Sequence, residues 1–250
     1  MVTETPAIPA ATLVVIRDRP EGPPELLMVE RAKEMAFAGG ALVFPGGRID
    51  DGDRALAADF PREDGAARIA AIRETLEETA IAVGILPVPA QELCGELQHA
   101  LLAGEHLSDL LNEHGLQLDL QALTAFARWV PKFHAVRRFD TLFFVARAPE
   151  PVPQPRVAGG ECAGAFWVAA AQALELERSG DIRLIFPTRR NLERLALHGS
   201  FDAIRSDALA HSLEPITPWA ETIDGDDYIC IPDGRGYPVT REKLDGLWRG

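Results

Sequence analysis

Short apolar runs bounded by Pro and Gly predict a series of β-strands along the chain. The first two runs are joined by a turn rich in Pro and Gly, and the third stops at Pro45-Gly46-Gly47, which reads as a Gly-rich turn. Four prolines between residues 149 and 155 indicate a loop before the last run. The predicted strands are residues 11–16, 25–30, 41–44, 126–130, 141–146 and 165–168.

Helical patterns alternate with these strands, so the organisation is mixed α and β. The clearest helix follows Asp64, a good N-cap residue, and is rich in strong helix formers. Residues 85–125 look helical and amphipathic, with recurring leucines. Shorter helices are predicted at residues 169–176 and 189–198, the latter with Thr188 as its N-cap.

The helix after Asp64 carries apolar and acidic residues on separate faces. At about 100° per residue, the apolar positions from Ile69 to Ala80 fall on one narrow stripe that would face a core. Glu74, Glu77 and Glu78 lie on average about 150° away from that stripe. The sequence therefore predicts three carboxylates gathered in one patch.

This placement is unfavourable for a helix on its own. Glu74 and Glu78 are four residues apart, where like charges destabilise a helix by about 0.2–0.5 kcal/mol. They also lie in the second half of the helix, where the macrodipole disfavours anions by roughly 0.3–1 kcal/mol each. A divalent cation between the carboxylates would offset both penalties. A solvated acidic face is the alternative, but the preceding Gly-Gly pair and the Arg-Glu-x-x-Glu-Glu spacing favour the metal site.

These residues resemble the Nudix box, the signature of Mg²⁺-dependent hydrolases that cleave nucleoside diphosphates linked to another group. The family pattern is Gly, five residues, Glu, seven residues, and Arg-Glu-U-x-Glu-Glu-x-Gly-U, with U a bulky aliphatic residue. Gly47 fits the first position, and Arg73-Glu74-x-x-Glu77-Glu78 fits the core of the pattern.

The chain departs from the pattern at several positions. Asp53 stands where the first Glu is expected, and its alternative role is that of a turn residue beside Gly52. Nineteen residues separate Asp53 from Arg73 where the pattern has seven, so twelve are inserted, within residues 54–65, and they read as a longer loop. Thr75 and Ala80 replace an aliphatic residue and a glycine.

The chemistry suggests a role for each box residue. Glu74 and Glu78 are the first-choice ligands of a hard cation, Mg²⁺ or Mn²⁺, and Glu77 is a further ligand or orients the attacking water. The spacing predicts an ion pair between Arg73 and Glu77, and the resemblance implies that Arg73 orients the glutamates. Gly46, Gly47 and Arg48 are candidate substrate-binding residues, because residues without a Cβ let the backbone approach closely.

Residues outside the box are also candidates. Many Nudix enzymes draw another carboxylate from a distant loop, and Glu161 and Asp140 are the candidates here, with Glu161 favoured as catalytic and Asp140 favoured as shaping a strand start. Arg137 and Arg138 could clamp phosphate bidentately. The alternatives are an exposed turn residue for Glu161 and ordinary surface charge for the two arginines.

The resemblance implies a Mg²⁺-dependent diphosphatase, and the layout is similar to the branch that contains coenzyme A diphosphatases. The Arg-Ser pair of one coenzyme A group and the Pro-rich array of NADH diphosphatases are both missing. Coenzyme A or acyl-coenzyme A is the first expectation, with ADP-ribose or a dinucleotide as the alternative substrate. A non-catalytic nucleotide-binding module on the same fold is the alternative of another class.

The resemblance also implies a Nudix fold of the α+β class, a mixed sheet sandwiched between helices. One elaborated domain over residues 1–250 is expected. Its core would be residues 10–84 and 126–198, with a helical insertion at 85–125 and an extension at 199–250. Whether that extension packs on the domain or builds a homodimer contact stays open.

Composition refines this picture. The net charge of −13 disfavours a broad electrostatic groove for DNA or RNA, so an anionic nucleotide must be met by local arginines and a cation. Three widely spaced cysteines argue against a disulfide framework, and no apolar run is long enough to span a bilayer. A cytoplasmic enzyme with no membrane or nucleic-acid partner is expected.

Overall fold

A mixed β-sheet forms the centre of the molecule in the computed structural model, which describes residues 6–33, 38–131 and 138–244. Its path runs β10-β3-β2-β1-β8-β7, while β4 pairs with β1 and β9 pairs with β2. The long central strand β1 is parallel to β8 and antiparallel to β2 and β4. The sheet strands are β1 (Ile8–Arg17), β2 (Glu25–Arg31), β3 (Ala41–Val43), β4 (Gly46–Arg48), β7 (Thr124–Trp129), β8 (Phe139–Arg147), β9 (Cys162–Ala169) and β10 (Arg183–Leu184).

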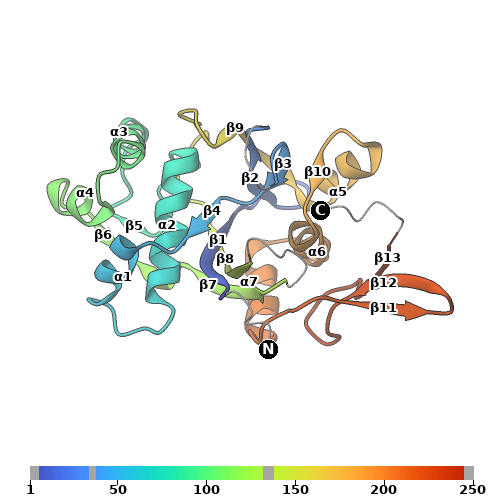
Figure 1. Ribbon diagram of the computed structural model, residues 1–250. Helices are drawn as coiled ribbons and strands as arrows, with labels where there is room; N and C mark the ends of the chain where they lie inside the picture. The colour runs from blue at the N-terminus through green and yellow to red at the C-terminus, as the bar shows by residue number, and fades with distance from the viewer. Residues whose placement is uncertain (1–5, 34–37, 132–137, 245–250) are drawn as a thin grey trace.

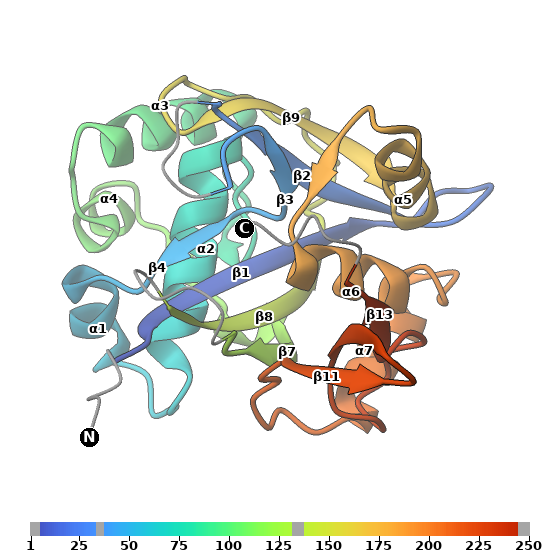
Figure 2. The same ribbon diagram turned by 45° about the vertical axis from the view of Figure 1, so that its right-hand side comes forward.

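Helices cover both faces of this sheet, which confirms the predicted α+β class (Figure 1). On one face, α2 (Gly65–Thr79) packs against β1, with α1 (Asp51–Ala57), α3 (Gln91–Leu102) and α4 (Leu107–Glu113) around it. On the other face lie α5 (Ala170–Ser179), α6 (Phe186–Leu195) and α7 (Phe201–Ala210) (Figure 2). Within the described ranges, no helix is long and apolar enough to cross a membrane.

The predicted stripe on α2 is confirmed as the inner face of that helix. Ile69, Ile72, Leu76 and Ala80 are all fully buried, in a cluster that includes Leu13 and other residues of β1. Asp64 occupies the N-cap position as predicted, but its carboxylate makes no capping bond and accepts instead from Arg68 Nε at 2.7 Å. Burial of the apolar stripe fixes which face α2 turns to the sheet.

Two segments predicted as irregular contain regular structure. Of the loop predicted at residues 54–65, residues 54–57 belong to α1, which begins with a capping box between Asp50 and Asp53, and residues 58–64 are irregular as predicted. Gly46–Arg48 is not a turn but strand β4, since residues without a Cβ at positions 46 and 47 can lie tightly against β1.

The later half of the chain also differs in detail. Helix α6 begins at Phe186, with Ile185 as its N-cap, so the prediction that Thr188 caps this helix is wrong. Pro187 lies in the first turn, where its missing N–H costs no hydrogen bond. Residues 85–125 hold α3 and α4, together with a short pair of strands, β5 (Ile85–Leu86) and β6 (Gln117–Leu118), and the 3-10 turn η1 (Leu120–Ala122). Helix α7 was not predicted.

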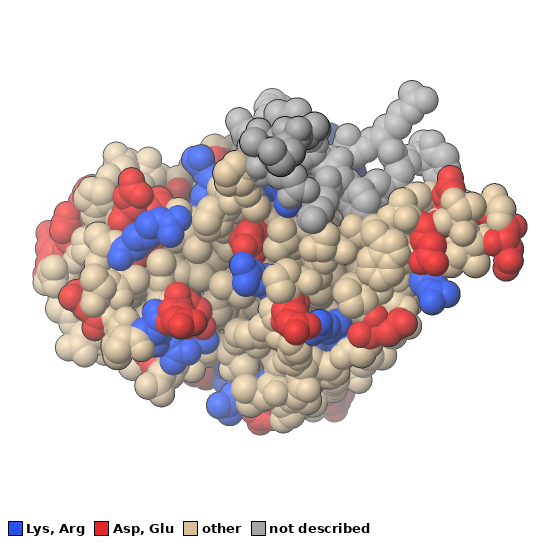
Figure 3. Space-filling view, turned by 60° about the horizontal axis from the view of Figure 1, so that its bottom comes forward, with Lys and Arg blue, Asp and Glu red and all other residues tan. Residues whose placement is uncertain are grey.

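The C-terminal segment folds onto the face covered by α6 and α7. A small antiparallel sheet consists of β11 (Trp219–Ile223), β12 (Asp226–Cys230) and β13 (Arg241–Lys243). Ile216, Ile231 and Tyr237 from this segment are buried in the same apolar cluster as α6. The three cysteines are buried and free. On the face drawn in Figure 3, arginine and lysine side chains are interspersed with acidic ones.

Candidate active site

A cavity of about 1010 Å³ lies where the chain passes from β3 to β4. Strand β3 pairs with β2 whereas β4 pairs with β1, so the two strands diverge at Phe44-Pro45. The cavity is lined by this crossing, by the acidic face of α2, and by the ends of β1 and β8. Its size is at the upper end of ligand pockets, which span roughly 300–1,000 Å³.

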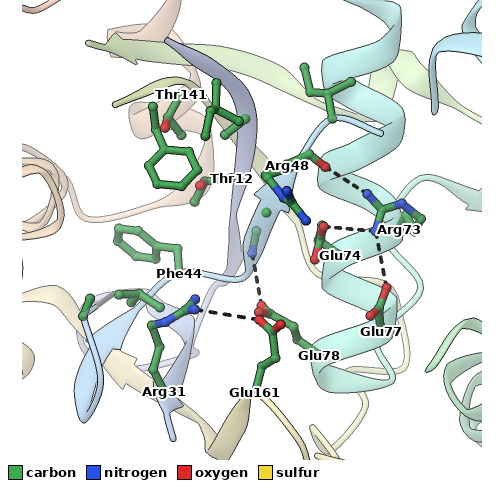
Figure 4. Close-up of a pocket in the computed structure, with 18 of the residues that line it drawn as sticks. Thr12, Arg31, Phe44, Arg48, Arg73, Glu74, Glu77, Glu78, Thr141 and Glu161 are labelled. Carbon is green, nitrogen blue, oxygen red and sulfur yellow. Dashed lines mark hydrogen bonds and ion pairs between the residues drawn. The ribbon is translucent and has the colours of Figure 1, made fainter. Parts of the chain in front are cut away.

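Arg73 organises the carboxylates on α2 (Figure 4). Its Nη1 atom lies 3.0 Å from Glu74 Oε1 and 3.3 Å from Glu77 Oε2, which confirms the predicted ion pair with Glu77. Its Nη2 atom donates to the carbonyl oxygen of Arg48 at 3.1 Å. One guanidinium therefore fixes two of the glutamates and ties α2 to β4.

Asp53 binds the Arg73 guanidinium on the side away from the cavity. Its two carboxylate oxygens accept from Arg73 Nε and Nη2, each at 2.9 Å, and its side chain is almost fully buried. The residues found to line the cavity, all within the described part of the chain, do not include Asp53. Asp53 is thus neither an exposed turn residue nor a wall of the cavity, but a support for Arg73.

The two glycines let β4 approach α2 closely. The backbone N–H of Gly46 donates to Glu78 Oε2 at 3.1 Å. A Cβ at Gly47 would fall onto the Glu74 carboxylate, and one at Gly46 would lie 2.5 Å from the carbonyl oxygen of Ala11. Packing of β4 on β1 therefore requires Gly46, whereas a side chain at position 47 would displace the Glu74 carboxylate. Arg48 has an exposed side chain at the cavity edge.

Burial and mutual repulsion perturb the carboxylates. Burial raises the pKa of Glu74 to about 7, with Arg73 opposing the shift and Glu77 adding to it. Burial also raises the pKa of Glu78 to about 8, and the neighbouring Glu74 carboxylate adds to that shift. The pKa of Glu77 is raised as well, mainly by burial. The local cations thus compensate only part of the negative charge.

This donor set fits a divalent cation. Carboxylate oxygens are the ligands that hard cations prefer, and like-charged carboxylates in a cavity are stabilised by a cation between them. Within the described residues, no three His, Cys, Asp or Glu side chains already form a group that could hold a metal ion. Arg73 holds Glu74 and Glu77, whereas Glu78 is bound to Gly46, so ligation requires side-chain rearrangement.

A second arginine, Arg31 at the end of β2, faces the α2 glutamates across the cavity and was missed from the sequence. Its Nη2 atom lies 3.7 Å from Glu161 Oε2, and its Nε atom is buried without a hydrogen-bond partner in the described structure. Glu161 lines the cavity with its side chain 68% exposed. A charged residue at the end of a buried strand was the only available signal for Arg31.

The remaining candidates are Arg137, Arg138 and Asp140, and they differ in whether they line the cavity. Arg138 lines the cavity at the start of β8, and Arg137 lies outside the described residues. Asp140 accepts from Arg128 at 2.8 and 2.6 Å, so it pairs across two strands, in agreement with the structural role favoured for it. The structure thus brings together Glu74, Glu77, Glu78, Glu161, Arg31 and Arg138 around one cavity.

The chain is similar in sequence and in structure to known Nudix hydrolases. No protein-family model matches the chain. The acyl-coenzyme A diphosphatase NUDT19 of Homo sapiens is 26% identical over 88% of this chain and 72% of its own length. The uncharacterized Nudix hydrolase NudL of Cronobacter sakazakii is 38% identical over 34% of this chain and 41% of its own. A crystal structure of a Nudix hydrolase from Alicyclobacillus acidocaldarius superposes with a TM-score of 0.71 at 31% identity, covering 84% of this chain and 98% of that one.

Proposed function

This chain belongs to the Nudix hydrolase family, and we propose that it hydrolyses the diphosphate linkage of coenzyme A or an acyl-coenzyme A with the help of Mg²⁺ or Mn²⁺. Divalent metal ions are used generally in this family. The observation that carries the proposal is the pair Glu74 and Glu78, two carboxylates of raised pKa that border one cavity. Such a pair invites a cation, and a diphosphate is the substrate group that would share it.

The preference for a coenzyme A substrate has two supports. The human relative that aligns over most of the chain is named as an acyl-coenzyme A diphosphatase. The cavity, at about 1010 Å³, is large enough for a substrate with two bulky halves.

The residues around the cavity have different proposed roles. Glu74, Glu77 and Glu78 would hold the cation, which supplies charge neutralisation on the diphosphate and a more acidic bound water. Arg73 orients Glu74 and Glu77, since it contacts both, and Asp53 keeps Arg73 in place. Arg31 and Arg138 border the cavity as cations for the phosphate oxygens. Glu161, which lines the cavity opposite α2, would accept a proton from the attacking water.

A hydrolysis panel tests the reaction and the substrate together. Coenzyme A, acyl-coenzyme A, ADP-ribose, NADH, diadenosine polyphosphates and nucleoside triphosphates would be incubated with Mg²⁺ or Mn²⁺, and products identified by mass. We expect coenzyme A compounds to yield a 3′-phosphoadenosine-containing product. Release of AMP from ADP-ribose or a dinucleotide as the dominant reaction would replace the coenzyme A assignment.

Two variants make the panel decisive. Glu78→Gln should lower kcat by at least about 100-fold, the scale seen when one preorganised electrostatic contact to a transition state is removed. Glu96→Gln, an exposed glutamate on α3 outside the cavity, is the matched control and should retain the parent rate. No turnover by folded, metal-binding protein would favour a nucleotide-binding module, and parental rates in Glu78→Gln would refute the metal site.

A further inference from the structure

The cavity has a charged part and an uncharged part. Figure 4 shows the glutamates and Arg73 on α2 at one side, and Thr12, Thr141 and Phe44 at the other. Thr12 and Thr141 belong to neighbouring parallel strands, where Thr12 pairs with Phe143 and Ala10 with Thr141. The uncharged part continues to the start of α6, and its wall includes Phe44, Phe143, Ile185, Pro187 and Thr188.

Thr188 is the unusual member of this wall. It lies in the first turn of α6, it is only 2% exposed, and it lines the cavity. Within the described ranges, its hydroxyl makes no hydrogen bond to the protein, and it is not among the buried polar atoms that lack a partner, so it faces the open cavity. A hydroxyl in this position is available to donate to or accept from a ligand.

The wall behind Thr188 is held rigidly. The Phe186 ring meets Trp129 edge to face at 5.9 Å, and Trp129 Nε1 donates to Tyr237 Oη at 3.1 Å. Trp129 also borders the cavity although it is 1% exposed. A preformed, largely apolar wall that carries the hydroxyl of the buried Thr188 suits an uncharged ligand with a hydrogen-bonding group.

We propose that this uncharged part binds the amide-bearing, pantetheine-like arm of the substrate, and that Thr188 determines specificity by hydrogen bonding to that arm. The inference rests on the proposed function and adds which half of the substrate lies where. The other half of coenzyme A carries an additional phosphate, which calls for several cations. Two of the arginines that line the cavity, Arg31 and Arg73, pair with Glu161 and with the α2 glutamates, so they belong to the charged part.

The test measures the two halves of the substrate separately. Dissociation constants of 4′-phosphopantetheine and of adenosine 3′,5′-bisphosphate would be determined by calorimetry with Mg²⁺ for the parent, Thr188→Val and Thr188→Ser. Thr188→Val keeps the shape and removes the hydroxyl, while Thr188→Ser keeps the hydroxyl. We expect Thr188→Val to weaken 4′-phosphopantetheine about tenfold, which corresponds to about 1.4 kcal/mol, and to leave adenosine 3′,5′-bisphosphate unchanged. Thr188→Ser should restore binding.

Kinetics give a second readout on the same proteins. The KM for coenzyme A should rise by a similar factor in Thr188→Val, with kcat nearly constant, because the contact is made equally in ground and transition states. Equal weakening of both halves, weakening of adenosine 3′,5′-bisphosphate alone, or no change would overturn the assignment. Calorimetry does not depend on turnover, so binding of 4′-phosphopantetheine without hydrolysis supports this inference while refuting the proposed reaction. Hydrolysis of coenzyme A by the parent, with the KM and the 4′-phosphopantetheine affinity unchanged in Thr188→Val, supports the proposed reaction while overturning this inference.

Discussion

Glu74 and Glu78 face each other across one turn of α2 in surroundings that cannot solvate two negative charges. Arg73 contacts Glu74, whereas Glu78 receives a neutral N–H from Gly46. Burial therefore dominates, and it raises the pKa of both carboxyls, to about 7 and about 8. Without a cation, each carboxyl holds a proton more tightly in the folded chain than in the unfolded chain.

This difference predicts an unusual pH dependence for the metal-free protein. A carboxyl with a raised pKa in the folded state stabilises that state below its ordinary pKa near 4.5, and the contribution is lost as pH rises through about 7 to 8. We expect the Tm in EDTA to fall between pH 6 and pH 9, and Mg²⁺ to reduce that fall because a cation stabilises the ionised pair. Thermal unfolding at several pH values measures both effects.

Glu78→Gln is the control for this pH prediction. It removes one titrating group and the repulsion on Glu74, so the fall in Tm should be smaller in EDTA. A Tm that rises from pH 6 to pH 9 in the parent would contradict the raised pKa values.

At the same scale, residue spacing in the sequence predicted the patch of three glutamates on α2 but not Arg31, the arginine across the cavity from them. The three glutamates lie within five residues, so helix geometry alone brings them together. Arg31 and Glu161 meet only because β9 pairs with β2, which places Gly164 opposite Glu30. Tertiary pairing of this kind leaves no local pattern for Arg31 beyond a charged residue at the end of a buried strand.

Among the elements, α1 shows how a support can be built beside a site. Residues 54–57 of the predicted loop belong to this helix, and its capping box includes Asp53, which is buried against Arg73. The signal was present, since Asp50 and Asp53 have the spacing of a capping box, but the resemblance drew attention to Asp53 as the counterpart of the first box Glu. Likewise, strand β4 was not predicted, because two of its three residues are glycines, which usually indicate a turn.

Asp53→Ala tests this support. The change leaves the buried Arg73 guanidinium without its bidentate partner and removes the cap of α1. Breaking a buried pair in this way costs about 3–5 kcal/mol, so the free energy of unfolding should fall by that amount. Activity should fall too, because Arg73 no longer holds the Glu74 and Glu77 carboxylates in place. Urea unfolding and kcat measure the two effects.

Asp59→Ala is the matched control for Asp53→Ala, because this exposed aspartate follows the same helix. It should change neither quantity appreciably. A stable and fully active Asp53→Ala protein would mean that Arg73 is positioned by Glu74, Glu77 and the Arg48 carbonyl alone.

At the scale of the whole molecule, the C-terminal segment packs behind the wall of the site. Tyr237 is buried against Trp129, with ring centroids 5.6 Å apart, and its hydroxyl donates to Asn191 Oδ1 at 2.8 Å. Arg190 on α6 reaches Glu242 on β13 at 2.9 Å. The sequence left open whether this segment packs on the domain, because these contacts join residues 46 to 108 positions apart.

Tyr237→Phe tests whether this segment stabilises the site. The change keeps the ring and removes the hydroxyl that links Trp129 to Asn191, so both groups lose a buried hydrogen bond. The expected loss is about 1–3 kcal/mol in the free energy of unfolding, measured in urea. The second tyrosine, Tyr228 on β12, is half-buried, and Tyr228→Phe should have little effect. Equal stability of the two variants would show that the segment packs beside Trp129 without supporting it. A loss confined to Tyr237→Phe, together with a higher KM for the preferred substrate, would tie the C-terminal segment to the cavity wall.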